Sequence, residues 1–179
     1  MTPELLDRAL IEEAAKKSGL VWVRAAGAPA ARALWHVWHE GAVCLVGDGP
    51  GEQPLTGLAD GGTAEVTVRS KDKGGRLVTF PATVSEPAAG SPEWEATVAE
   101  LKGKRLNAPD GEEMPGRWAR ECRVLRLVPA GPTAPAPEGS LAAPPVPSPA
   151  TTRRPIPAGL PKLLAKRREK RRRKEDLKK

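Results

Sequence analysis

Prolines divide the chain unevenly, and this division limits where a folded domain can form. The range 129–161 holds 11 of the 20 prolines, with Ala, Gly and Ser between them. Proline fixes φ and supplies no backbone N–H, so such a stretch is typical of an extended linker without a core. We therefore expect a folded domain over 1–128, a disordered Pro/Ala-rich linker over 129–161 and a basic tail over 162–179.

The net charge of +7 belongs to the tail. Residues 162–179 carry 11 Lys and Arg against 3 Asp and Glu, whereas residues 1–128 carry 16 against 18. A slightly acidic body excludes a protein that binds nucleic acid over its whole surface. The tail lacks aromatic residues to stack on bases, which leaves either weak, salt-sensitive contact with nucleic acid or a solvated extension that aids solubility.

The lengths of the apolar stretches, the N-terminal residues and the cysteine count exclude several other classes of protein. The apolar stretches are only a few residues long, so no membrane span is expected. The N-terminus carries acids where a secretory signal needs an apolar run. Two cysteines, Cys44 and Cys122, exclude a disulfide-rich scaffold and a four-thiolate zinc site. These features predict a cytoplasmic protein.

Within 1–128 the apolar pattern changes between helical and strand periods. Thr2 followed by Pro3 predicts a helix start, and Ser91-Pro92 predicts another that runs to about Leu106. His39-Glu40-Gly41 is typical of a tight hairpin turn, and Pro81 inside a strand run indicates an edge strand or a bulge. The predicted strands cover 20–26, 33–38, 42–46, 64–70, 76–85 and 122–128.

This order contains hairpin-linked strands, one late helix and no alternation of strand with helix. A parallel, doubly wound sheet is therefore not expected. The pattern predicts a mainly β fold, a small antiparallel barrel with an N-terminal and a late helix. The long Gly- and Pro-rich loop at 47–62 is either a functional loop that exposes backbone N–H groups to a phosphate, or a plain surface loop.

The stretches ALWHVWHEGAVCLVGDGPGEQPLTGL, AEVTVRSKDKGGRLVTFPATVS, SPEWEATVAELKGKRLN and VLRLVP resemble the pyridoxamine 5′-phosphate oxidase-like split β-barrels. The resemblance covers about residues 18–129 and rests on element order and hydrophobic pattern. It implies a split β-barrel that binds FMN or the deazaflavin coenzyme. It also implies a homodimer with the flavin in a groove at the dimer interface.

The resemblance also implies which residues hold the cofactor. The family commonly places a Ser or Thr and a Lys in the loop after the third strand, where this chain has Gln53 and Thr56 but no Lys between 33 and 68. An Arg guanidinium suits phosphate because its planar fork donates two hydrogen bonds. The predicted cofactor-binding residues are Trp35 and Val37 as groove walls, with Gln53, Thr56, Arg69, Ser70 and Lys71 around the phosphate.

No catalytic residue is predicted. His36 and His39 lie at odd spacing on one strand and so face opposite sides, which argues against a metal site with Cys44. No nucleophile with a matched base emerges, and in flavin chemistry the cofactor carries the reaction. Two functions stay open: an oxidoreductase acting on an unidentified small molecule, or a non-catalytic barrel module tethered to nucleic acid by its tail. The missing Lys near Gln53 favours the second.

Overall fold

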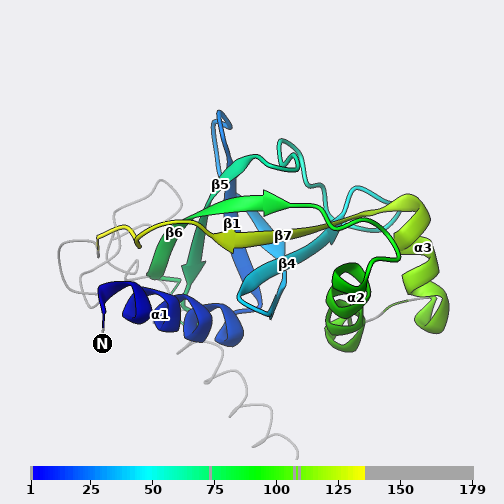
Figure 1. Ribbon diagram of the computed structural model, residues 1–179, viewed down its shortest axis with the longest axis horizontal. Helices are drawn as coiled ribbons and strands as arrows, with labels where there is room; N and C mark the ends of the chain where they lie inside the picture. The colour runs from blue at the N-terminus through cyan, green and yellow to red at the C-terminus, as the bar shows by residue number, and fades with distance from the viewer. Residues whose placement is uncertain (1, 73, 107, 109, 136–179) are drawn as a thin grey trace, which may run out of the picture. The chain divides into compact units, whose positions relative to one another are not determined.

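The computed structural model describes residues 2–72, 74–106, 108 and 110–135. The chain is mainly antiparallel β, as the sequence predicts. Seven strands form one sheet in the order β2-β1-β5-β6-β7-β4-β3, in which each strand runs antiparallel to its neighbours. Figure 1 shows helix α1 beneath these strands and helices α2 and α3 beyond β4 and β7. The greater part of the predicted linker and the whole basic tail lie outside the described residues.

The element bounds agree closely with the predicted runs. The helices and turns are α1 (Pro3–Lys17), α2 (Pro92–Lys104), the short 3-10 turn η1 (Gly111–Glu113) and α3 (Met114–Glu121). The strands are β1 (Leu20–Ala25), β2 (Arg32–Trp35), β3 (Val37–His39), β4 (Ala42–Gly47), β5 (Thr63–Arg69), β6 (Arg76–Ser85) and β7 (Arg123–Pro129). The run predicted at 33–38 is therefore divided at His36.

This division explains how the sheet becomes a nearly closed barrel. Strands β2 and β3 form the two outer strands of the sheet, yet only His36 separates them in the sequence. One bent segment therefore pairs with β1 through β2 and with β4 through β3. The predicted hairpin turn is confirmed, because Glu40 and Gly41 between β3 and β4 both have positive φ, 42° and 75°.

Pro81 lies in β6, an interior strand of the sheet, and the register of β5 and β6 shifts between Val68 and Arg69 instead of at Pro81. The Pro81 carbonyl accepts a hydrogen bond from the Ala130 amide, just beyond the Ala82–Pro129 pair that ends the β6–β7 ladder. In an antiparallel strand, the N and the C=O of one residue point toward the same neighbouring strand, so the N–H that Pro81 lacks would point toward the β7 side. That position lies just beyond the last pair of the β6–β7 ladder. The expectation of an edge strand was wrong.

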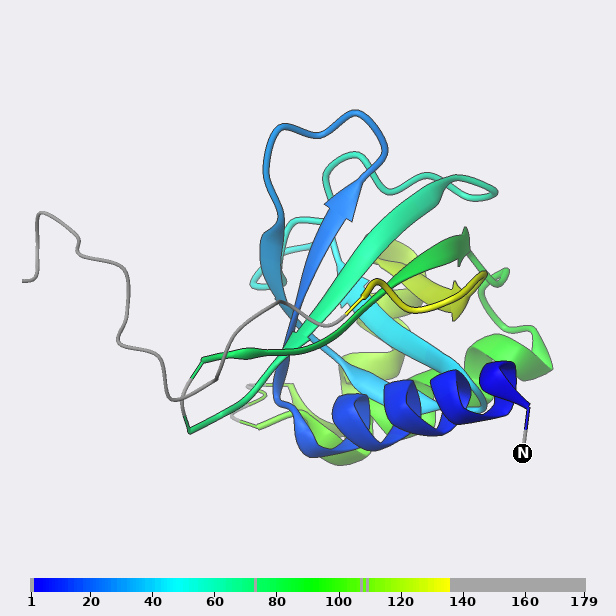
Figure 2. The same cartoon turned by 90° about the vertical axis from the view of Figure 1, so that its left-hand side faces the viewer.

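Two separate clusters of buried side chains form the core. The main core fills the barrel interior and includes Val21, Val66, Phe80 and Leu125, with Ile11 from α1. The second core lies on the other side of β4 and β7, beneath α2 and α3. Its largest members are Trp94, Met114 and Trp118. Figure 2 shows α1 lying across the lower end of the strands, where it packs on β3, β5 and β6.

Candidate functional site

The Gly- and Pro-rich loop at 47–62 is built into the barrel. Leu55 and Leu58 are 1% and 4% exposed and belong to the main core. The Gln53 side-chain carbonyl accepts from the Trp35 amide at 2.7 Å, and its NH₂ donates to the Trp35 and Val46 carbonyls at 2.8 and 3.2 Å. The loop therefore bridges β2 and β4, which do not pair with each other in the sheet.

Close backbone contact fixes this loop further. Gly47 forms an isolated parallel bridge with Gln53, and a Cβ at Gly47 would lie 2.2 Å from the Gln53 carbonyl oxygen. Asp48 has a positive φ of 61°, and its carboxylate accepts from the Leu55 amide at 2.7 Å. These contacts give the loop a defined structural role, which sequence patterns did not distinguish from a phosphate-binding role.

Glu52 of the same loop is a buried carboxylate between two arginines. Its side chain is 2% exposed, and its oxygens lie 3.0 Å from the Arg105 guanidinium and 3.2 Å from that of Arg117. The indole N–H of Trp118 donates to the same carboxylate at 3.0 Å. Asp110 takes the other side of Arg117, whose hydrogen bond lowers the Asp110 pKa. This network joins the loop to α3 and to the end of α2.

The predicted cofactor residues fall into two groups along the sheet. On one side of β1, Leu20 pairs with Trp35 of β2. On the other side of β1, Val21 pairs with Val68 of β5, and continuing this register by one residue places Arg69 opposite Leu20. Ser70 and Lys71 follow Arg69 in the turn after β5, where the Ser70 hydroxyl accepts from the Asp72 amide at 3.3 Å. Trp35 and the 69–71 turn therefore lie at the same end of β1.

Val37, Gln53 and Thr56 differ from the other predicted residues in what they offer a ligand. Val37 is 3% exposed and lies inside the second core, which leaves almost none of its side chain accessible. The Gln53 amide is engaged by the backbone of β2 and β4, as described above. Thr56 is exposed in the loop between the two buried leucines. Their roles in cofactor binding stay predictions.

Two tryptophan–arginine pairs distinguish the outer side of the sheet. The Arg69 guanidinium lies 4.9 Å from the ring centre of Trp22, and that of Arg105 lies 5.4 Å from the ring centre of Trp35. Both rings are half-buried. Leu20, 44% exposed, lies two residues before Trp22 on β1 and pairs with Trp35 on β2. Alternation along β1 turns Leu20 and Trp22 outward while Val21 and Val23 are buried. We call these four residues, Leu20, Trp22, Trp35 and Arg69, the outer sheet face.

Trp22 and Arg105 were not among the predicted site residues. A signal for Trp22 existed, since alternation along LVWVRAA places it on the same side as Leu20. No sequence signal indicated that Arg105, at the end of α2, would lie over Trp35, because this contact depends on how α2 packs against the sheet.

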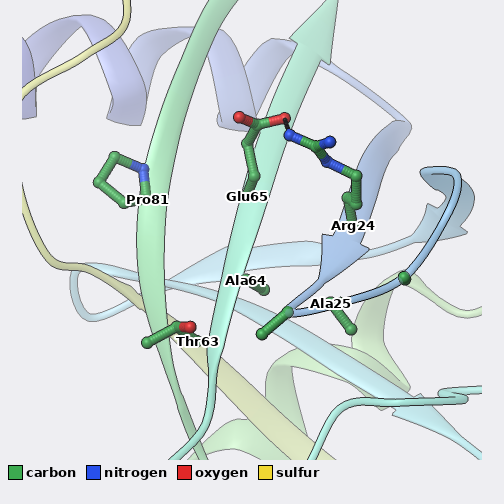
Figure 3. Close-up of a pocket in the computed structure, with 9 residues that line it drawn as sticks. Arg24, Ala25, Thr63, Ala64, Glu65 and Pro81 are labelled. Carbon is green, nitrogen blue, oxygen red and sulfur yellow. Dashed lines mark hydrogen bonds and ion pairs between the residues drawn. The ribbon is translucent and has the colours of Figure 1, made fainter.

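A shallow depression of about 470 Å³ lies at the other end of β1, as Figure 3 shows. Its wall is mainly backbone and small side chains of Ala25–Ala28, with Thr63, Ala64 and Pro81. The Arg24–Glu65 ion pair, 3.0 Å long, crosses it with both side chains about half exposed. None of the predicted cofactor residues lines this depression.

The histidines and cysteines have structural surroundings. The His36 Nε2 lies 3.0 Å from the Ala15 carbonyl, to which it can only donate, and burial lowers the His36 pKa to about 4. Burial raises the pKa of the Cys44 thiol to about 12 and also raises that of Cys122. Within 2–72, 74–106, 108 and 110–135, no group of three or more His, Cys, Asp and Glu side chains is placed to hold a metal ion. In the same part of the chain, no helix is long and apolar enough to cross a membrane.

Comparisons with known proteins support the fold. No protein-family model and no curated sequence matches the chain. The crystal structure of HutZ, the heme storage protein from Vibrio cholerae, is similar with a TM-score of 0.53 and 14% identity, over 69% of this chain and 90% of that one. A putative general stress protein 26 from Jannaschia sp. CCS1 has a TM-score of 0.47 and 14% identity, over 72% of this chain and 76% of that one. An FAD and heme binding protein from Mycobacterium smegmatis has a TM-score of 0.42 and 17% identity, over 89% of this chain and 93% of that one.

Proposed function

We propose that this chain is a flavin-binding split barrel that holds FMN or the deazaflavin coenzyme on its outer sheet face, between two copies of the chain. In this proposal the protein is an oxidoreductase that acts on a small molecule. The observation that carries the proposal is the arrangement of Trp22 and Trp35, each with a guanidinium over its ring, next to an exposed Leu20.

The chemistry of the outer sheet face fits a planar ring that bears a phosphate. Half-buried indole rings offer flat apolar surfaces for stacking, and a ring ligand that stacks there gains more than from area burial alone. Arg69 and Lys71 bring two positive charges to the same end of the sheet, and a guanidinium pairs well with phosphate oxygens. The bound flavin would supply hydride transfer, while these side chains would bind and orient it.

A second copy of the chain suits the same surface. Leu20 and Leu77 are 44% and 45% exposed, and exposed apolar residues that gather on one sheet face mark an interaction surface. The tryptophans add the residue type most enriched at the centres of interfaces. A pair of such faces would exclude water from the rings, which the open face of one copy does not do.

A heme-type ligand is the second candidate. The similar fold of HutZ, a heme storage protein, favours a planar macrocycle as a ligand class for this barrel. The same tryptophan rings and cationic groups would meet a porphyrin and its carboxylates. The non-catalytic alternative, with a tail that contacts nucleic acid, remains a separate prediction that the ligand titrations below address.

The test is a titration of the purified full chain with FMN, with the deazaflavin coenzyme and with heme, followed by absorbance and flavin fluorescence. We expect micromolar binding of a flavin, weakened roughly 10- to 150-fold by Arg69→Ala, since losing a charge-assisted phosphate contact costs roughly 1.5–3 kcal/mol. Arg32→Ala is the matched control, because Arg32 is exposed on β2 but at the other end of its pairing with β1.

Leu20→Asp provides the second arm. It should convert the dimer to a monomer in sedimentation experiments and weaken flavin binding together with it. Binding of heme but no flavin would favour the second candidate. A failure of all three ligands to bind would overturn the cofactor proposal, and salt-sensitive retention on DNA or RNA would then support the tethered module.

A further inference from the structure

The two tryptophan–arginine pairs differ in what holds the arginine in place. Over Trp35, the Arg105 guanidinium lies 3.0 Å from the Glu52 carboxylate and donates to the Gly51 carbonyl at 3.4 Å. Glu52 is 2% exposed. Moving Arg105 away would leave this buried carboxylate with less compensating charge, which is costly. Arg105 is therefore a fixed cover on the Trp35 ring.

Arg69 is not held in this way. It is exposed, and in the part of the chain that the structure describes its guanidinium forms no ion pair and no hydrogen bond. Its contact with the ring of Trp22, at 4.9 Å from the ring centre, is a cation–π contact at an exposed site, which is weak. Because nothing else holds the guanidinium, it can leave the ring at little cost. Arg69 is thus a movable group, whereas Arg105 is fixed.

The two indole rings also differ in their surroundings. Trp35 packs against the second core, and Gln53 holds its backbone N–H and C=O at 2.7 and 2.8 Å. Trp22 faces outward and, among the described residues, is not one of those that pack against either core. Its cross-strand neighbours are Ala33 on β2 and Thr67 on β5, whose small side chains leave room beside the ring. The Trp22 ring is therefore open once its arginine leaves, and the Trp35 ring stays enclosed.

We propose that Arg69 is a gate residue on Trp22: a planar anionic ligand takes the place of the guanidinium on the indole, and the guanidinium moves to the anionic group of the ligand. Arg105 stays on Trp35, and this pair forms a fixed wall of the site. Glu52 does not touch the ligand and acts as a positioning residue that holds the wall. The inference deepens the proposed function and rests on it for the identity of the ligand, a flavin that bears a phosphate.

Such an exchange selects for a ligand that carries negative charge. FMN breaks the weak contact between Arg69 and Trp22 and gains a charge-assisted pair with the same guanidinium. Riboflavin lacks the phosphate, so it breaks the contact and gains no such pair. Arg69 therefore favours FMN and disfavours riboflavin, whereas a residue that only offers a stacking surface would treat both ligands alike.

The first test compares FMN with riboflavin on the purified full chain, by flavin fluorescence. Arg69→Ala should weaken FMN binding roughly 10- to 150-fold, yet it should tighten riboflavin binding roughly two- to fivefold, because no cation–π contact remains to be broken. Arg105→Ala is the matched variant, since it removes the guanidinium from the other tryptophan. It should leave the ratio of the two affinities unchanged, because Arg105 does not meet the phosphate.

The second test asks which indole meets the ligand. In two-dimensional NMR spectra of the full chain, Trp22→Phe and Trp35→Phe assign the two indole N–H signals. FMN should shift the Trp22 signal and leave the Trp35 signal nearly unchanged. Without any flavin, iodide is an anionic probe that quenches tryptophan fluorescence on contact. Trp22→Phe should remove more of the iodide-dependent quenching than Trp35→Phe does.

The outcomes separate this inference from flavin binding itself. If FMN binds but Arg69→Ala weakens riboflavin as much as FMN, or if FMN shifts the Trp35 signal as much as the Trp22 signal, the gate is wrong while flavin binding stands. If neither flavin binds, the proposed function fails and the iodide experiment decides the gate. Greater quenching at Trp22 then supports a ring that anions reach, and equal quenching of both rings overturns it.

Discussion

The two cores of this protein are built on different principles. The main core consists of apolar side chains that alternate along strands and meet inside the barrel, from Val21 to Phe80 and Leu125. The second core combines Trp94, Met114 and Trp118 with polar groups at its border: the buried Arg126, and Glu52 held between arginines. The first depends on area removed from water, whereas the second also depends on specific pairing of charges.

This difference determines what each region tolerates. An apolar core loses stability in proportion to the volume removed, and hydrophobic replacements of similar size are accepted. A buried charged network fails when one member is removed, because the partners remain buried without compensation. The second core also holds the loop at 47–62 against α3, so its failure would loosen the bridge between β2 and β4.

The largest expected effect comes from the main core. Phe80 of β6 is fully buried in the main core, so Phe80→Ala should lower the free energy of unfolding by about 4 kcal/mol, since it leaves a cavity. Urea unfolding followed by tryptophan fluorescence measures this. Phe80→Leu is the control and should cost clearly less. Equal losses for both variants would contradict the view that volume governs this region.

The strands were predictable because their signal is local. Alternation along 64–70 identifies a strand without any knowledge of its partners, and His39-Glu40-Gly41 marks a hairpin whose positive φ values at Glu40 and Gly41 agree with that turn. The Ser91 cap of α2 is confirmed too, because its hydroxyl accepts from the Trp94 amide. Each of these features depends on residues close together in the sequence.

The second core and the candidate site were predictable only in part, because their signals are not local. Helix α3 was not predicted, although its Pro115 lies in the first turn, where Pro is accepted. The resemblance predicted Gln53 as a cofactor-binding residue, a role that stays a prediction, but no sequence signal indicated that its amide bridges β2 and β4. The burial of Glu52 depends on Arg105 and Arg117, more than fifty residues away.

The next effect concerns a polar group that joins α1 to the barrel. Burial lowers the His36 pKa from 6.5 to about 4, so between these values the unfolded chain binds a proton that the folded chain does not. Stability is therefore fully present above pH 6.5 and decreases as the pH falls toward 4, by at most about 3 kcal/mol. Urea unfolding at a series of pH values measures the decrease.

The control for this prediction is His36→Gln, which keeps a donor for the Ala15 carbonyl and does not titrate. The variant should show a flatter stability profile between pH 6.5 and 4. A profile as steep as that of the native chain would assign the pH dependence to the carboxylates instead of His36.

A smaller effect tests the buried pairing of the second core. Glu52→Gln removes the charge that faces Arg105 and Arg117 while retaining an acceptor for the Trp118 indole, and should cost about 2 kcal/mol. The loss should change little in high salt, because buried pairs are poorly screened. An exposed ion pair, Arg24 with Glu65, provides the comparison.

The smallest effect is expected at Arg24 and Glu65, the exposed pair that faces across β1 and β5. Its oxygen and nitrogen lie 3.0 Å apart, the same distance that joins Glu52 to Arg105. Distance alone would thus predict equal contributions. Because both side chains are about half exposed, a double-mutant cycle of Arg24→Gln with Glu65→Gln should give a coupling of about 0.5 kcal/mol that disappears in 1 M salt. A coupling as large as that of Glu52, or one that resists salt, would mean that burial does not separate the two regions.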